Sequence, residues 1–179
     1  KGYGNSYTTP CDVTTRAFAC QVLLSLCETV GMRMRRDDWA GRCLAVHIRS
    51  NLFEESSRQR QLPAATNGTD ELYRAACALF DELWDGATPL RQLGVQVTKL
   101  SRGEARQCSF FDPTDYERLG RLDAAVDAIR DKFGEDALLR ATFLKSRVAS
   151  MEGGLGKDRR TGVTKPVEEA LSPLARIAP

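Results

Sequence analysis

The sequence contains few residues of the kinds that enzymes use for acid–base, nucleophilic or metal chemistry. His47 is its one histidine, and its six cysteines include no C-x-x-C pair. No nucleophile-elbow pattern surrounds any serine, and no carboxylate cluster has metal-ligand spacing. These absences argue against a Ser-His-Asp hydrolase and against a bound metal, and we expect His47 to be a surface residue.

Long apolar runs are missing as well. No run approaches the ~20 residues that a membrane-spanning helix needs, and no secretory signal is visible. The cysteines are scattered among apolar residues, which is typical of core thiols in a reducing cytosol, so we expect a cytoplasmic protein with no membrane partner. The first residue is lysine rather than methionine, from which we expect a fragment or a processed product.

Neither sign of charge is in large excess. The formal net charge is +2, and 28% of the residues are charged, so the bulk charge does not indicate a nucleic-acid binder. The segment between residues 33 and 60 is nevertheless locally basic. Its arginines are Arg33, Arg35, Arg36, Arg42, Arg49, Arg58 and Arg60.

Hydrophobic periodicity predicts the same pattern of elements twice. Residues 3–9 read as a short strand, and the helix that follows carries apolar residues every four positions from Phe18 to Met34. Residues 42–50 alternate as a half-buried strand does, and residues 56–62 are its predicted hairpin partner. A second helix is predicted from Thr69, with Gly86 as its stop, and residues 90–100 return to strand.

This order predicts an α+β fold, a four-stranded antiparallel sheet with two helices on one face, made by duplicating strand–helix–strand. We expect this sheet domain over residues 1–101, a linker over 102–113, and C-terminal helices over 114–144. Those helices are predicted at 114–134 and 136–144. From residue 145 to 179 the chain is rich in glycine, proline and charge, and it reads as a flexible tail.

Two surfaces remain as candidates for function. The first is the sheet face that the helices leave open, which carries Arg, Gln, Ser and Thr side chains. Their donors suit the phosphate oxygens of a nucleic acid without specifying a sequence. The alternatives are a sheet face that is merely solvated, or one that the third helix covers. Composition alone does not favour the nucleic-acid surface over these alternatives.

The second surface is a short peptide in which Phe110 and Phe111 stand side by side in a polar segment. One reading is that the two rings pin the linker onto the core. The other is a linear motif whose aromatic residues fill an apolar pocket of a partner. Burying two such rings would contribute ~3–6 kcal/mol before ordering costs, which is enough for weak docking.

Four segments in this order resemble the C-terminal region of bacterial Y-family translesion DNA polymerases, in the polymerase IV and UmuC branch. They are Lys-Gly-Tyr-Gly-Asn-Ser at 1–6, Ser-Arg-Gln-Arg-Gln-Leu at 57–62, Arg-Gln-Leu-Gly-Val-Gln-Val at 91–97, and Asp-Ala-Ala-Val-Asp-Ala-Ile-Arg-Asp-Lys-Phe-Gly at 123–134. The resemblance covers about residues 1–144. In that family the duplicated strand–helix unit is the little finger domain.

The resemblance implies two partners and the residues that meet them. The open sheet face of a little finger lies along the major groove of double-stranded primer–template DNA and holds both backbones. By position, the implied DNA-binding residues are Ser6, Tyr7, His47, Arg49, Ser57, Gln59, Gln92, Gln96 and Thr98. A peptide after the domain docks on the bacterial β sliding clamp, and here it would be Gln107, Cys108, Ser109, Phe110 and Phe111.

The resemblance also places catalysis elsewhere. Polymerase activity resides in palm, fingers and thumb domains that precede this segment, so it implies no catalytic residue, metal or cofactor here. The parent would be a magnesium-dependent DNA polymerase that bypasses damaged bases, as in DNA repair and the SOS response. The alternative is a ferredoxin-like adaptor that binds protein or RNA. A small hydrolase or transferase would need a convergent polar pocket, which the residue inventory does not offer.

Overall fold

Period-two alternation in four segments builds one antiparallel sheet. The computed structural model of the chain describes residues 1–102, 114–144 and 146–151. The strands are β1 (Tyr3–Val13), β2 (Ala40–Ser50), β3 (Glu55–Thr66) and β4 (Leu90–Ser101), and they lie in the order β1-β4-β2-β3. All three pairings are antiparallel. The predicted sheet is therefore confirmed, with each strand slightly longer than expected.

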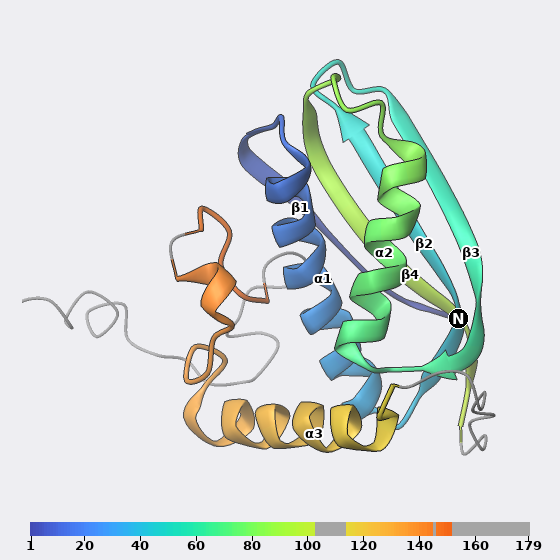
Figure 1. Cartoon of the computed structure of the whole chain (residues 1–179), viewed down its shortest axis with the longest axis vertical. Coiled ribbons are helices and arrows are strands. Elements are labelled where there is room, and N and C mark those ends of the chain that lie inside the picture. Colours follow the sequence, from blue (N-terminus) through green and yellow to red (C-terminus); the bar gives the residue numbers. More distant parts are fainter. Residues whose placement is uncertain (103–113, 145, 152–179) are drawn as a thin grey trace, which may run out of the picture.

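Two helices pack side by side over one face of this sheet (Figure 1). They are α1 (Arg16–Arg36) and α2 (Thr69–Leu83). Their apolar stripes meet the inward residues of the central strands in one core. Its members include Leu23, Leu26, Val30, Leu72, Phe80, Leu44, Val46, Leu93 and Val95. The predicted α+β class, with both helices on one face, is confirmed.

The first helix is the most deeply buried element. Among the helices that the structure describes, α1 alone is long and apolar enough to cross a membrane, and 78% of that apolar stretch is buried inside the protein. Thr15 begins the helix by accepting a hydrogen bond from the backbone N–H of Phe18 at 3.3 Å. Arginines occupy its last turn, where the partial negative charge of the helix end favours cations.

The C-terminal part differs in detail from the prediction. The third helix, α3 (Tyr116–Phe133), begins two residues later than expected because the Asp115 side chain caps it. The helix predicted at 136–144 is wrong: this region holds only a short 3₁₀ turn, η1 (Ala141–Phe143), amid turns and irregular backbone. Figure 1 shows α3 lying across the ends of α1 and α2, away from the open sheet face.

The tail prediction is wrong for residues 146–151. This segment packs along α1, where Val148 joins the core and Met151 is fully buried. The Ser25 hydroxyl of α1 donates to the backbone oxygen of Ala149 at 2.8 Å. Val148 and Met151, with hydrogen bonds such as those from Ser25 to Ala149 and from Ser150 to Glu28, dock a stretch whose composition reads as tail.

Candidate nucleic-acid interface

Register places the polar side chains of the four strands in rows across the open face. Residues directly opposite one another in an antiparallel sheet project to the same side. Three rows run through all four strands: Thr8, Gln92, Arg49 and Glu55; Ser6, Gly94, His47 and Ser57; Gly4, Gln96, Ala45 and Gln59. A further row joins Thr98, Cys43 and Gln61. The alternate positions lie under the helices, so these rows form one continuous face.

The structure brings together nearly all the residues that were expected to face DNA. Those on the open face are Ser6, His47, Arg49, Ser57, Gln59, Gln92, Gln96 and Thr98. Tyr7 is the exception, and placing it on this face was wrong. It pairs with Leu93 and packs against the core, because a neighbour of Ser6 in a strand must project to the opposite side.

The face is concave rather than flat. A hollow of about 940 Å³ lies over β2, β3 and the middle of β4. Its lining includes His47, Arg49, Ser57, Gln59, Gln92 and Gln96. The amide of Gln92 donates to the Ser6 hydroxyl at 3.4 Å, which links β4 to β1 across the surface. Five of its eleven lining residues carry amide or hydroxyl groups that can donate hydrogen bonds, and Arg49, Glu55 and Arg58 carry charge.

The electrostatics of this face are close to neutral. Arg49 is the one Lys or Arg in the four rows, and its Nε donates to Glu55 Oε1 at 2.8 Å. His47 is half-buried, and this burial lowers the pKa of its imidazole below the ordinary value. Near neutral pH the imidazole is therefore uncharged. Neutral donors, not a dense positive patch, dominate the surface.

The locally basic segment between residues 33 and 60 does not form one patch. By register Arg58 and Arg60 alternate with the open-face residues of β3, and both bind Glu82 of α2; the Arg58 Nη1–Glu82 Oε2 distance is 2.9 Å, although part of Arg58 also lines the hollow. Arg35 binds Asp127 of α3 through its Nε at 2.6 Å. Strand parity and helix packing therefore place Arg35, Arg58 and Arg60 in separate ion pairs, whereas Arg42 donates to the backbone oxygens of Leu62 and Pro63.

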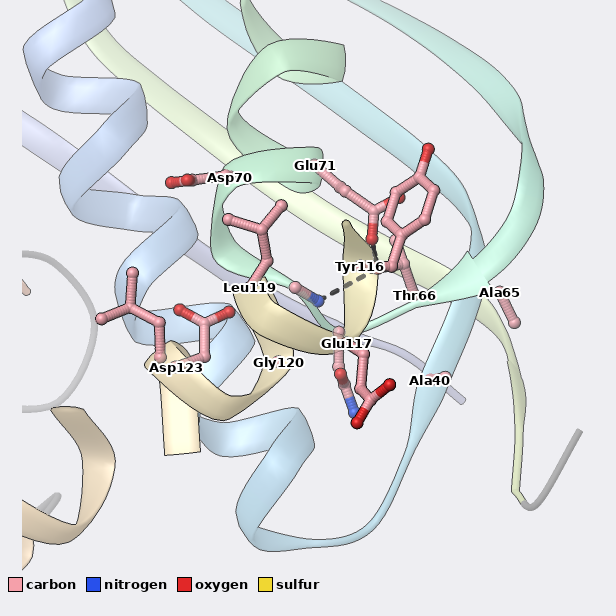
Figure 2. A pocket seen from close by; sticks show the side chains of 13 residues that line it. Ala40, Ala65, Thr66, Asp70, Glu71, Tyr116, Glu117, Leu119, Gly120 and Asp123 are labelled. Atoms are coloured by element: carbon pink, nitrogen blue, oxygen red, sulfur yellow. Dashed lines mark hydrogen bonds between the residues drawn. The ribbon is translucent and has the colours of Figure 1, made fainter. Parts of the chain in front are cut away.

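A second hollow, of about 380 Å³, lies where the start of α3 meets the β3–α2 connection. Figure 2 shows Leu119 and Asp123 of α3 on one side and Glu71 with Thr66 on the other. The Thr66 hydroxyl donates to Glu71 at 2.5 Å. The lining contains carboxylates, apolar groups and the polar side chains of Thr66, Asn67 and Tyr116, and no histidine, cysteine, serine or lysine.

No group of three or more His, Cys, Asp or Glu residues is placed to hold a metal ion within residues 1–102, 114–144 and 146–151. The expected clamp-binding peptide, Gln107 to Phe111, lies outside the described residues.

These observations define the class of the protein. It is an α+β domain whose helices cover one sheet face and leave a polar, concave face open. The sequence model of the impB/mucB/samB family C-terminal domain matches residues 1–110. The chain belongs to this family. The resemblance to the C-terminal region of polymerase IV-type proteins is thereby confirmed.

Individual relatives agree with this assignment. DNA polymerase IV 2 of Halalkalibacterium halodurans is 39% identical over 153 residues, which cover 83% of this chain and 37% of that protein. DNA polymerase IV of Clostridium acetobutylicum is 33% identical over 145 residues, covering 81% and 36%. The chain thus spans somewhat more than a third of each relative.

A solved complex of a β-clamp processivity factor with the little finger domain of PolIV matches with a TM-score of 0.48 at 18% identity, over 63% of this chain and 100% of that one.

Proposed function

We propose that this chain is a non-catalytic module that holds DNA and tethers a translesion DNA polymerase to its sliding clamp. Residues 1–101 would form the DNA-binding domain, and residues 102–113 a linker that carries the clamp-binding peptide. The observation that carries this proposal is the continuous polar face, built in register by four strands of a chain whose relatives are named DNA polymerase IV.

The proposed contact is with the phosphate backbones of duplex DNA. The side-chain amides of Gln59, Gln92 and Gln96, with the hydroxyls of Ser6 and Ser57, can donate to phosphate oxygens without reading bases. Arg49 supplies the charge-assisted hydrogen bond of this set. The face is concave, so donors from three strands can follow a rounded backbone. A polymerase that must move along any sequence needs contacts of this kind.

The proposed tether is the peptide from Gln107 to Phe111. Two adjacent aromatic side chains suit an apolar pocket on a partner, with Gln107 fixing register by hydrogen bonds. The longer protein would be a magnesium-dependent, cytoplasmic polymerase that copies past damaged bases during DNA repair and the SOS response. Its metal ligands would lie outside this chain, so no chemical step is assigned to the residues described here.

A duplex-binding titration tests the first half of the proposal. Fluorescence anisotropy with a labelled primer–template duplex should show saturable binding at low salt that weakens as salt rises, because phosphate contacts release counterions. Gln59→Ala combined with Gln96→Ala should weaken this binding. Arg121→Gln is a control on the exposed side of α3. Binding that ignores salt, or that the two glutamine changes leave intact, would contradict the proposed face.

A second titration tests the tether independently. The chain should bind a bacterial β clamp, and Phe110→Ala combined with Phe111→Ala should abolish the binding while leaving the thermal midpoint unchanged. If neither form binds and the double variant melts earlier, the two rings pin the linker to the core instead. DNA binding would then stand alone, and the clamp proposal would be wrong.

A further inference from the structure

Two free thiols from different helices meet on the helix layer. Cys77 of α2 donates its S–H to Cys20 of α1 across an Sγ–Sγ distance of 3.5 Å. Cys20 is 7% exposed and Cys77 is partly exposed, so the pair sits at the rim of the core and not inside it. By contrast, Cys27 is wholly buried, and Cys43 contacts Gln59 on the sheet side.

The surroundings of this pair separate the roles of its two members. The hydrogen bond from Cys77 lowers the pKa of the Cys20 thiol, and the Arg16 guanidinium one helical turn away acts in the same direction. Arg16 is fixed there by Asp81, with Nε 2.6 Å from Oδ1. The same hydrogen bond raises the pKa of Cys77, so Cys77 keeps its proton. Cys20 is thus the readier thiolate, and the thiolate is the reactive form of cysteine.

We propose that Cys20 and Cys77 are a modification site: a thiol pair that peroxides oxidise to a reversible disulfide between α1 and α2. The Cys20 thiolate attacks one oxygen of hydrogen peroxide, the O–O bond breaks, and the departing hydroxide takes up a proton to become water. The Cys77 sulfur then attacks the resulting sulfenic acid, forming the S–S bond and releasing a second water. Two thiols lose two electrons, and the peroxide gains them. An external dithiol reverses the reaction by exchange.

The geometry favours closure of this bond. A disulfide needs an S–S distance of ~2.05 Å, so rotation of the two side chains must shorten the present 3.5 Å separation. The helices already pack against each other through the core.

The position of the bond defines what it does to the molecule. It joins residues 57 positions apart and so closes a loop that contains most of α1, β2, β3 and part of α2. Such a cross-link restricts the unfolded chain, and we expect the thermal midpoint to rise by on the order of 10 °C. The pair lies on the helix layer, so the rows on the open face are untouched. Oxidation should therefore protect the fold without changing that surface, and this inference does not depend on the proposed DNA binding.

The test is oxidation of the full chain with hydrogen peroxide, followed by alkylation and peptide mass mapping. The expected result is a cross-linked pair of peptides containing Cys20 and Cys77, a monomer that has lost two hydrogens, and a higher thermal midpoint that dithiothreitol reverses. Cys77→Ala should lose both the cross-link and the rise. Cys11→Ala, which removes a partly exposed thiol outside the pair, should keep both.

Two outcomes would overturn the proposal. In one, both thiols of the oxidised wild-type chain remain open to alkylation, or the bridge found by mapping uses Cys11 or Cys108 instead. In the other, Cys77→Ala shows the same rise in thermal midpoint as the wild type. Should Cys77→Ala fail to fold, the mapping of the wild-type chain decides by itself.

Discussion

The imidazole of His47 on β2 lies directly over Gly94 on β4. A Cβ atom built on Gly94 would come within 1.8 Å of His47 Nε2 and 2.0 Å of its Cε1. The missing side chain at position 94 is therefore the space that the ring fills. This contact holds the one histidine of the chain in the centre of the open face, half-buried and with a lowered pKa.

Gly94→Ala should displace the His47 ring and lower the free energy of unfolding by about 1–3 kcal/mol, as overpacking does. Urea denaturation measures the loss. His47→Ala removes the ring that Gly94→Ala would clash with. Gly94→Ala should therefore lower the free energy of unfolding less in the His47→Ala protein than in the wild type. Equal losses in both backgrounds would show that the contact between the ring and Gly94 carries no energy.

The lowered pKa of His47 predicts how stability depends on pH. The unfolded chain binds the proton at the ordinary pKa of 6.5, whereas the folded chain binds it only at lower pH because of burial. Stability is therefore full above pH 6.5 and falls as the pH drops through the folded pKa. Thermal midpoints measured from about pH 7.5 to about pH 5.5 should fall more for the wild type than for His47→Gln. Parallel curves for the two proteins would contradict this assignment.

The sheet could be predicted from the sequence because strand patterning is local. Leu44, Val46 and Ile48 alternate with polar residues, so the pattern alone assigns the two faces of β2. The error at Tyr7 came from departing from this alternation. Its strand was placed, but adjacent residues were both put on the open face, which a period of two does not allow.

The contacts of the C-terminal part could not be predicted in this way. Glu28 meets Arg130 although 102 positions separate them, and nothing in the local pattern of either helix indicates the partner. The same holds for Cys20 and Cys77: each occupies an ordinary helical position, and only the packing of α1 on α2 brings the sulfurs together. Contacts of this kind depend on how whole elements dock, which periodicity does not encode.

The carboxylate of Glu28 should be the main electrostatic attachment of α3 and the segment after it. It is 3% exposed, and it accepts hydrogen bonds from Arg130 at 3.3 Å and from Arg140 at 3.1 Å, as well as from the Ser150 hydroxyl. Glu28→Gln removes the carboxylate with which buried Arg130 pairs. We expect the free energy of unfolding to fall by about 3–5 kcal/mol, the range found when one partner of a buried pair is removed.

Hydrogen exchange locates this loss. Amides in α3 should exchange faster in Glu28→Gln, while the central strands β2 and β4 remain protected. Arg121→Gln breaks the exposed i,i+4 pair with Glu117 and should change stability by less than about 0.5 kcal/mol. A Glu28→Gln protein as stable as this control would show that the Glu28 ion pairs do not hold α3, which would leave that role to apolar contacts and to the pairs of Arg35 with Asp123 and Asp127.

The ion pair between Arg49 and Glu55 predicts an unusual gain of DNA affinity. Glu55 is the one carboxylate in the four rows, and it neutralises their one guanidinium. Glu55→Gln removes a negative charge from the proposed contact surface and frees Arg49 for a phosphate. Duplex binding at low salt should tighten several-fold, and the salt dependence should steepen by about one released counterion. Arg49→Gln should act in the opposite direction, because it leaves Glu55 facing the DNA.

Position, and not only net charge, should decide this effect. Glu117→Gln makes the same charge change on the exposed side of α3, where the side chain is 82% exposed and paired with Arg121. Anisotropy titrations of Glu55→Gln, Arg49→Gln and Glu117→Gln against one duplex therefore distinguish an effect of position on the open face from an effect of net charge. If Glu117→Gln tightens binding as much as Glu55→Gln, the overall field attracts the DNA and the open face has no special part in it. If Glu55→Gln alone tightens it, and Arg49→Gln weakens it, the duplex lies along the rows that contain this pair.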